Sequence, residues 1–133
     1  MAESKSSNDE TQVRKQSQLL KKIPDRFQAS VVVLKGHAEG MEFLISKEYT
    51  VIGRDKGADI VLKDAQVSRQ HAAIEYREGN YTLKDLESTN GTRMSGTLIK
   101  ETTLHHGDKF SVGDTALQFV LEDIGKSRTY EIG

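Results

Sequence analysis

Residues 53–92 of the chain read GRDKGADIVLKDAQVSRQHAAIEYREGNYTLKDLESTNGT, and this stretch decides the fold. Apolar and polar residues alternate in it over short runs, a pattern typical of half-buried β-strands. Three polar clusters interrupt or end these runs: Gly53-Arg54, residues 68–71 (SRQH) and residues 88–92 (STNGT). We therefore expect the apolar runs to form the framework and the three clusters to be loops.

The side chains in the three clusters are of the kinds that bind phosphate groups. Arg54 carries a planar guanidinium that can donate two hydrogen bonds to phosphate oxygens, and Arg69 can add a second positive charge. Ser68 and Thr89 offer hydroxyl donors, and the amide of Asn90 can both donate to and accept from a peptide main chain. If these loops meet at one end of a sheet, they form a cationic, donor-rich notch suited to a phosphate oxyanion.

The same β pattern continues on both sides of this stretch. Candidate strands cover residues 31–34, 41–45, 49–52, 59–62, 72–76, 81–86, 98–99, 109–112 and 117–121. Gly79-Asn80 fits a tight two-residue turn between two of them. About ten short strands at regular spacing, with no convincing helix after residue 27, predict an all-β sandwich or barrel.

Composition divides the chain into one domain and two polar flanks. Residues 1–26 contain few large apolar side chains and are predicted to be a flexible tail, residues 27–122 to be the domain, and residues 123–133 to be a tail or linker. Thr11 lies in the acidic sequence DETQV, where a kinase could reach it. The 27 − 11 = 16 residues to Phe27 span roughly 20 to 24 Å as a flexible coil, so docking of a phosphorylated tail on its own domain is sterically open.

Composition and charge narrow the classes of function. The chain carries 19 Lys plus Arg and 20 Asp plus Glu, a formal charge of −1, so nothing in the overall charge indicates nucleic acid or anionic lipid as a partner. No apolar run approaches the roughly 18 residues of a membrane span, and the N-terminus lacks the apolar core of a signal peptide. We therefore expect a cytoplasmic protein.

No cofactor is expected either. The chain has no Cys, which excludes disulfides and thiolate metal sites. His105 and His106 are adjacent, and neighbouring residues of an extended segment point to opposite sides. A shared metal between these two side chains is therefore not predicted.

Five segments, in this order and spacing, make the sequence resemble the forkhead-associated (FHA) domain of the bacterial type. They lie between residues 29 and 121 and are residues 52–54 (IGR), 59–62 (DIVL), 67–72 (VSRQHA), 85–92 (DLESTNGT) and 104–108 (LHHGD). The resemblance implies a two-sheet antiparallel β-sandwich of eleven strands, one of them near Arg93-Met94. Its loops are expected to bind a phosphothreonine peptide in signalling downstream of a Ser/Thr kinase.

The resemblance also assigns roles to particular residues. It places Arg54, Ser68, Arg69, Thr89 and Asn90 in the phosphopeptide site. His71 is implied to be a structural residue hydrogen-bonded between loops, and Gly53 and Gly91 are interpreted as positions where only glycine allows a close approach or a positive φ. One departure is visible, because Ser95-Gly96 stands where family members often carry an Asn-Gly turn, and Ser tolerates positive φ less well than Asn.

Three interpretations of the function remain open. The first is a non-enzymatic module that recognises phosphothreonine in a partner, with the chain's own N-terminal tail as one candidate partner. The second is an enzyme, suggested by the spacing of Ser68 and His71, although the chain lacks a Gly-x-Ser-x-Gly elbow, and no Gly-Lys-Ser/Thr follows Gly57. The third is a scaffold of the same fold that binds without phosphorylation.

Overall fold

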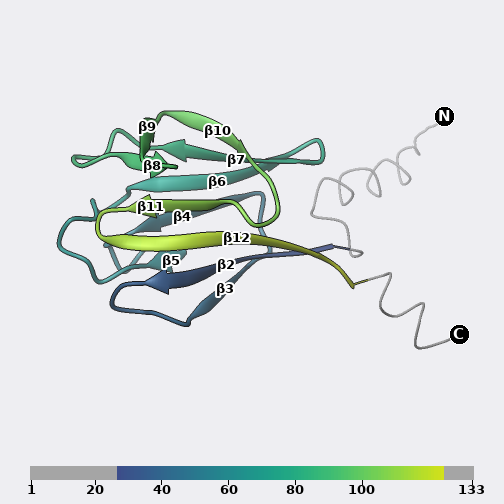
Figure 1. The fold of residues 1–133 in the computed structure, drawn as a ribbon, viewed down its shortest axis with the longest axis horizontal. Helices are drawn as coiled ribbons and strands as arrows, with labels where there is room; N and C mark the ends of the chain where they lie inside the picture. Colours follow the sequence, from purple (N-terminus) through teal and green to yellow (C-terminus); the bar gives the residue numbers. More distant parts are fainter. Residues whose placement is uncertain (1–26, 125–133) are drawn as a thin grey trace, which may run out of the picture.

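The computed structural model describes residues 27–124, which fold into a two-sheet β-sandwich (Figure 1). The predicted tail of residues 1–26, with Thr11, and residues 125–133 lie outside the described residues. In chain order the strands are β2 (Phe27–Lys35), β3 (Glu42–Ile45), β4 (Tyr49–Gly53), β5 (Ile60–Val61), β6 (Ala72–Arg77), β7 (Asn80–Asp85), β8 (Thr92–Met94), β9 (Thr97–Ile99), β10 (Glu101–Leu104), β11 (Lys109–Val112) and β12 (Thr115–Asp123). The predicted all-β, two-sheet fold is confirmed.

Two of these strands, β8 and β10, have no counterpart among the strands read from the alternation of residues. β8 is the strand that the family resemblance implied near residues 93–94. β10 has the sequence ETTL and lies at an edge of its sheet, and Leu104 is its one buried residue. A largely polar edge strand carries little of the hydrophobic alternation that identifies strands in a sequence.

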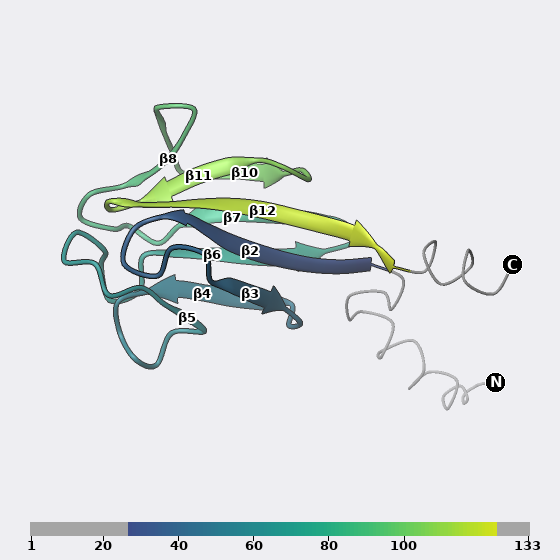
Figure 2. The same ribbon diagram turned by 60° about the horizontal axis from the view of Figure 1, so that its bottom comes forward.

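The strands form a six-stranded sheet in the order β3-β2-β12-β11-β8-β9 and a five-stranded sheet in the order β10-β7-β6-β4-β5. Neighbouring strands pair antiparallel, except that β4 and β5 are parallel. Asp123 at the end of β12 pairs with Phe27 at the start of β2, so the described chain enters and leaves at the same end of the sandwich. β4 ends at the opposite end, and Figure 2 shows its arrow pointing away from the start of β2 and the end of β12.

The hydrophobic core lies between the two sheets and is built by alternate residues of the strands. Ala29, Val31 and Val33 of β2 are each at most 1% exposed, and Leu117 and Phe119 of β12 are fully buried. Because successive side chains of a strand point to opposite faces, the alternation in the sequence places these residues on the inner face. The stable sandwich then serves as a support for the loops at its ends.

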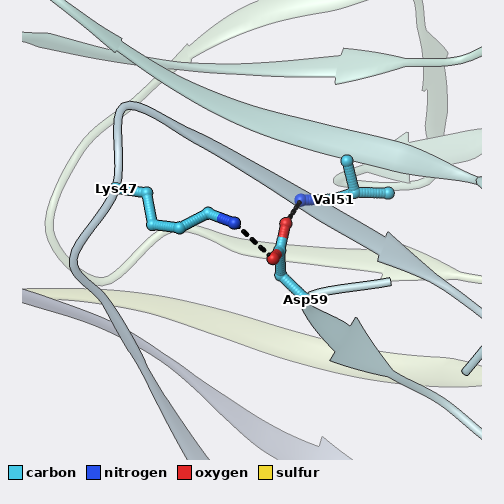
Figure 3. Close-up of polar contacts among 3 residues, drawn as sticks. All are labelled: Lys47, Val51 and Asp59. Carbon is cyan, nitrogen blue, oxygen red and sulfur yellow. Dashed lines mark hydrogen bonds and ion pairs between the residues drawn. The ribbon is translucent and has the colours of Figure 1, made fainter. Parts of the chain in front are cut away.

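Asp59 holds the two-residue strand β5 against β4 (Figure 3). Its Oδ2 accepts a hydrogen bond from the main-chain N of Val51 at 2.8 Å, and its own main-chain N donates to the O of Val51 at 2.9 Å. Its Oδ1 accepts from Nζ of Lys47 at 2.6 Å. The bond from Lys47, followed by the bond from Val51, holds the pKa of Asp59 below its ordinary value. This carboxylate adds bonds that so short a parallel strand cannot make alone.

Two hairpin turns place a residue other than glycine in left-handed backbone. Glu78 and Gly79, with φ of 51° and 86°, connect β6 to β7, because Arg77 pairs with Asn80. The turn predicted at Gly79-Asn80 is therefore wrong by one residue, since the cross-strand register decides which residues remain unpaired. In the other hairpin Ser95 has φ of 52° and precedes Gly96, so a serine occupies a position that favours Asn.

A buried hydroxyl in the core gives the first prediction. Tyr81 is 4% exposed, its ring contacts those of Tyr76 and Phe119, and its hydroxyl has no hydrogen-bond partner among residues 27–124. We expect Tyr81→Phe to raise the free energy of unfolding by about 1 kcal/mol, because it removes an unpaired polar group and keeps the ring. Urea titration measures this, and Tyr49→Phe, at a residue 42% exposed, is the control with no expected change. A lower free energy of unfolding for Tyr81→Phe would contradict the prediction.

The same burial makes stability depend on pH in the alkaline range. Burial, with a smaller effect of Tyr76, raises the pKa of Tyr81 from 10.0 to about 12. Between these two values the folded protein keeps a proton that the unfolded chain releases, so the free energy of unfolding falls as the pH rises. We predict that urea titrations across this range show a smaller fall for Tyr81→Phe than for the wild type. Equal falls would show that Tyr81 does not cause the dependence.

Candidate functional site

The first loop follows β4 and covers residues 54–59, and the second loop precedes β6 and covers residues 62–71. These two loops lie against each other. The main-chain N of Arg54 donates to the O of Ser68 at 3.0 Å, and the N of Asp55 donates to the O of Arg69 at 3.2 Å. Nε of Arg54 donates to the O of Val67 at 2.9 Å. The two terminal nitrogens of this guanidinium make no hydrogen bond within residues 27–124. The side chain is therefore held by one nitrogen beside Ser68, and its other donors stay available.

Gly53 allows this close approach of the two loops. A Cβ at this position would lie 1.9 Å from the main-chain O of Arg69, so no larger residue fits without moving the backbone. The third loop lies between β7 and β8 and covers residues 86–91. Gly91 meets two constraints in it, because its φ is 86° and a Cβ would lie 2.4 Å from Cδ2 of Leu98. Both glycines therefore sit where the backbone requires the absence of a side chain.

Ser68 joins the second loop to the third. Its Oγ accepts a hydrogen bond from the main-chain N of Thr89 at 3.0 Å, across 21 residues of sequence. The hydroxyl proton of Ser68 takes no part in this bond and has no acceptor in the described part of the chain. The side chains of Arg69 and Thr89 are exposed beside it and make no hydrogen bond within residues 27–124.

His71 connects the same two loops from beneath and is fully buried. Its Nδ1 lies 3.0 Å from the main-chain N of Ser68, and its Nε2 lies 2.9 Å from the O of Gly91. A main-chain N–H can only donate and a carbonyl can only accept, so Nδ1 carries the lone pair and Nε2 the proton. The ring faces the main chain of Ser68 and not its hydroxyl. This geometry argues against a Ser-His hydrolase pair, in which the base must take the hydroxyl proton.

Asp85 organises the third loop, and the sequence interpretation did not assign it a role. Its Oδ1 accepts from Oγ of Ser88 at 2.6 Å and from Oγ1 of Thr92 at 2.8 Å, and its Oδ2 accepts from the N of Ser88 at 3.1 Å. Burial opposes its ionisation, but the hydrogen bonds from Ser88 and Thr92 outweigh it and hold the pKa of Asp85 below its ordinary value. An Asp three residues before a Ser is a local turn signal that could have identified it.

Asp64 anchors the second loop to the turn between β11 and β12. Its Oδ2 accepts from the N of Asp114 and from Oγ1 of Thr115, each at 2.8 Å, and its Oδ1 accepts from the N of Gln66 at 2.9 Å. Burial opposes its ionisation, and these hydrogen bonds again lower the pKa. The bonds to the turn span 50 and 51 residues of sequence, so no local sequence pattern predicts them.

Asn90 lies in the third loop and reaches back to the second. Its Nδ2 donates to the main-chain O of Gln66 at 2.8 Å and to Oε1 of Gln66 at 3.1 Å. Its Oδ1 makes no hydrogen bond within residues 27–124. The sequence predicts that Asn90 uses both ends of its amide on a peptide, but in this structure Gln66 engages the donor end.

The structure thus brings the three predicted loops to one end of the sandwich, opposite the described ends of the chain (Figures 1 and 2). Among the described residues, donors or acceptors of four side chains stay unpaired there, those of Arg54, Ser68, Thr89 and Asn90, and Arg69 adds a second cation. Within residues 27–124 there is no group of three or more His, Asp or Glu side chains that could hold a metal, and no helix long and apolar enough to cross a membrane. The arrangement is suited to hold an anionic, hydrogen-bond-accepting group at a fixed point.

Comparisons with known proteins identify the family that the chain resembles. The family model of the FHA domain matches residues 50–113. The oxoglutarate dehydrogenase inhibitor of Corynebacterium efficiens is 35% identical over 92 residues, which are 69% of this chain and 65% of that protein. The chain thus spans just under two thirds of the length of this curated relative.

Two solved structures resemble the fold. The FHA domain of the CT664 protein from Chlamydia trachomatis is 32% identical with a TM-score of 0.65, covering 70% of this chain and 96% of that one. A structure from a study of phosphothreonine-dependent FHA domain interactions is 28% identical with a TM-score of 0.65, covering 70% of this chain and 95% of that one.

Gly53 provides a test of the loop contact. We expect Gly53→Ala to lower the free energy of unfolding by more than about 2 kcal/mol, because the added methyl group meets the main chain of Arg69. Gly57→Ala is the matched control, since a Cβ there comes no closer than 3.1 Å to the Asp55 side chain. Urea titration of the two variants measures the difference. Equal stability of the two would show that the close approach does not constrain residue 53.

Proposed function

This chain belongs to the FHA domain family, and from this premise we propose that it is a non-enzymatic module that binds phosphothreonine in a partner protein. One observation carries the proposal. Arg54 and Ser68 are held at one rim by bonds through other atoms, and within residues 27–124 the terminal nitrogens of Arg54 and the hydroxyl proton of Ser68 have no partner. A phosphate ester, with three acceptor oxygens and up to two negative charges, is complementary to such a set.

Each predicted site residue has a role in the proposal. Arg54 and Ser68 donate to the phosphate oxygens, Arg69 adds positive charge at the rim, and Thr89 lines the notch. Asn90 contacts the peptide main chain beside the phosphothreonine. Gly53, His71 and Gly91 support these loops through the close approaches and hydrogen bonds of the structure.

The strength of binding follows from the number of charged contacts. Charge-assisted hydrogen bonds contribute about 1.5 to 3 kcal/mol each, and the sum after the cost of association corresponds to micromolar affinity, near −8 kcal/mol. Phosphothreonine is preferred over phosphoserine because its additional methyl group gains about 0.8 kcal/mol if it is buried between the loops.

The biological role that fits this chemistry is signalling downstream of a Ser/Thr kinase. One relative is named as an inhibitor of oxoglutarate dehydrogenase, and one similar structure comes from a study of phosphothreonine-dependent interactions. We infer that the module recruits or regulates a phosphorylated partner in the cytoplasm. The proposal includes no cofactor and neither nucleic acid nor a membrane as a partner.

The chain's own N-terminal segment is a further candidate partner. Thr11 lies outside the described residues, and its acidic surroundings suit a kinase. We propose that Thr11 is a phosphosite whose phosphothreonine docks on the loops of its own or a second copy. Treatment with a Ser/Thr kinase followed by mass spectrometry tests the first step, with Thr11→Ala as the control. Absence of phosphate at residue 11 would remove this part of the proposal.

Arg54 gives the decisive test. We expect Arg54→Ala to weaken binding of a phosphothreonine peptide by roughly a hundredfold, because two charge-assisted hydrogen bonds are lost. Arg77→Ala is the control, since Arg77 ends β6 away from the site and pairs with Glu75 on the surface. Isothermal titration of a peptide from a phosphothreonine library measures both, with thermal melting to show that each variant folds.

Three results would count against the assignment. Equal binding by wild type and Arg54→Ala would mean that Arg54 does not hold the phosphate. Equal binding of the phosphorylated and the phosphatase-treated peptide would favour a scaffold of the same fold that does not depend on phosphorylation. Labelling of Ser68 by a serine-reactive probe would revive the hydrolase interpretation.

A further inference from the structure

Gln66 lies beside the site and has no role in the assignments above. Its main-chain O and its side-chain Oε1 accept hydrogen bonds from Nδ2 of Asn90 at 2.8 and 3.1 Å. An amide nitrogen carries two protons, so both donors of Asn90 are engaged. The acceptor Oδ1 is left as the end of the Asn90 amide that can contact a ligand.

Gln66 is held by a chain of hydrogen bonds that ends in the core. Its main-chain N donates to Oδ1 of Asp64, whose Oδ2 accepts from Oγ1 of Thr115, and Thr115 is 2% exposed. Gln66 and Asn90 are themselves exposed, so water competes for their bonds and the pair adds little to the stability of the fold. The contact therefore mainly determines which way the amide of Asn90 faces.

We propose that Gln66 is a positioning residue that presents Oδ1 of Asn90 to the bound peptide, so that Asn90 recognises a main-chain N–H of the phosphopeptide. This inference rests on the proposed function and narrows it. Asn90 accepts one hydrogen bond from the peptide instead of clamping it through both ends of the amide. A consequence for the partner is that proline is disfavoured at that peptide position, because proline has no N–H to donate.

Removal of single N–H groups from the peptide tests the direction of this bond. The probe is the tightest-binding peptide of a phosphothreonine library, remade with each main-chain N–H within two residues of the phosphothreonine replaced in turn by an ester oxygen. We expect one replacement to weaken binding to the wild type about tenfold, the loss of one hydrogen bond. With Asn90→Ala the same ester and its parent amide should bind equally.

Variants of Gln66 test the positioning role through the ratio of the affinity for the parent amide peptide to the affinity for its ester. We call the loss of affinity caused by the ester the ester penalty. Gln66→Met keeps the length of the side chain and removes its acceptor, so we expect the ester penalty to fall to about threefold with an unchanged melting temperature. Gln66→Glu retains an acceptor and should keep the tenfold penalty. Gln70→Met is the matched control, because Gln70 is exposed in the same loop and its side chain makes no hydrogen bond within residues 27–124.

The outcomes separate this inference from the proposed function. If no ester position affects the wild type, or if Gln66→Met shows the full wild-type penalty, the positioning role is wrong while phosphothreonine binding stands. If Gln66 has only a structural role, Gln66→Met weakens binding of the ester and of the amide peptide equally and leaves the ratio of their affinities unchanged. This result would also overturn the positioning role. If the wild type binds no member of the phosphothreonine library, both proposals fail.

Discussion

The candidate binding end of this domain depends on one buried imidazole. His71 accepts a hydrogen bond from the main chain of Ser68 and donates one to Gly91, and so joins two loops whose ends lie 20 residues apart. Only the neutral ring with its proton on Nε2 can make both bonds, because one partner is a donor and the other an acceptor. A fully buried polar ring with both nitrogens satisfied fixes the distance between the loops without exposing any of its own groups to a ligand.

Carboxylates complete the support and explain why the donors at the rim stay free. Asp64 and Asp85 each accept three hydrogen bonds from main-chain N–H groups and hydroxyls of the loops. An ionised carboxylate only accepts, so it satisfies the loop donors that would otherwise compete for the phosphate. The guanidinium of Arg54 is correspondingly bound by a single carbonyl instead of a carboxylate, which would neutralise it. The site therefore keeps its positive charge while its loops are rigidly held.

The two long strands are predictable from local sequence for different reasons. β12 alternates buried and less buried residues from Thr115 to Val120, and this period is visible without any knowledge of partners. β2 is predicted from the β-branched run at residues 31–34. β10 escaped detection because only Leu104 of its four residues is buried. The β6–β7 turn was misplaced by one residue, because the pairing of Tyr76 with Tyr81 across the strands decides which two residues remain for the turn. Cross-strand pairing depends on both strands together, so the sequence of either strand alone does not predict it.

Alternation and side-chain type are local properties, so the β framework and the chemical identity of the side chains at its loops can be predicted from the sequence alone. Which atoms of those side chains are already hydrogen-bonded depends on the tertiary structure. The bonds of Asn90 to Gln66 and of Asp64 to the β11–β12 turn span 24 and 50 residues. They exist because separate strands deliver their loops to one end of the sandwich, and spacing along the chain carries no information about such meetings.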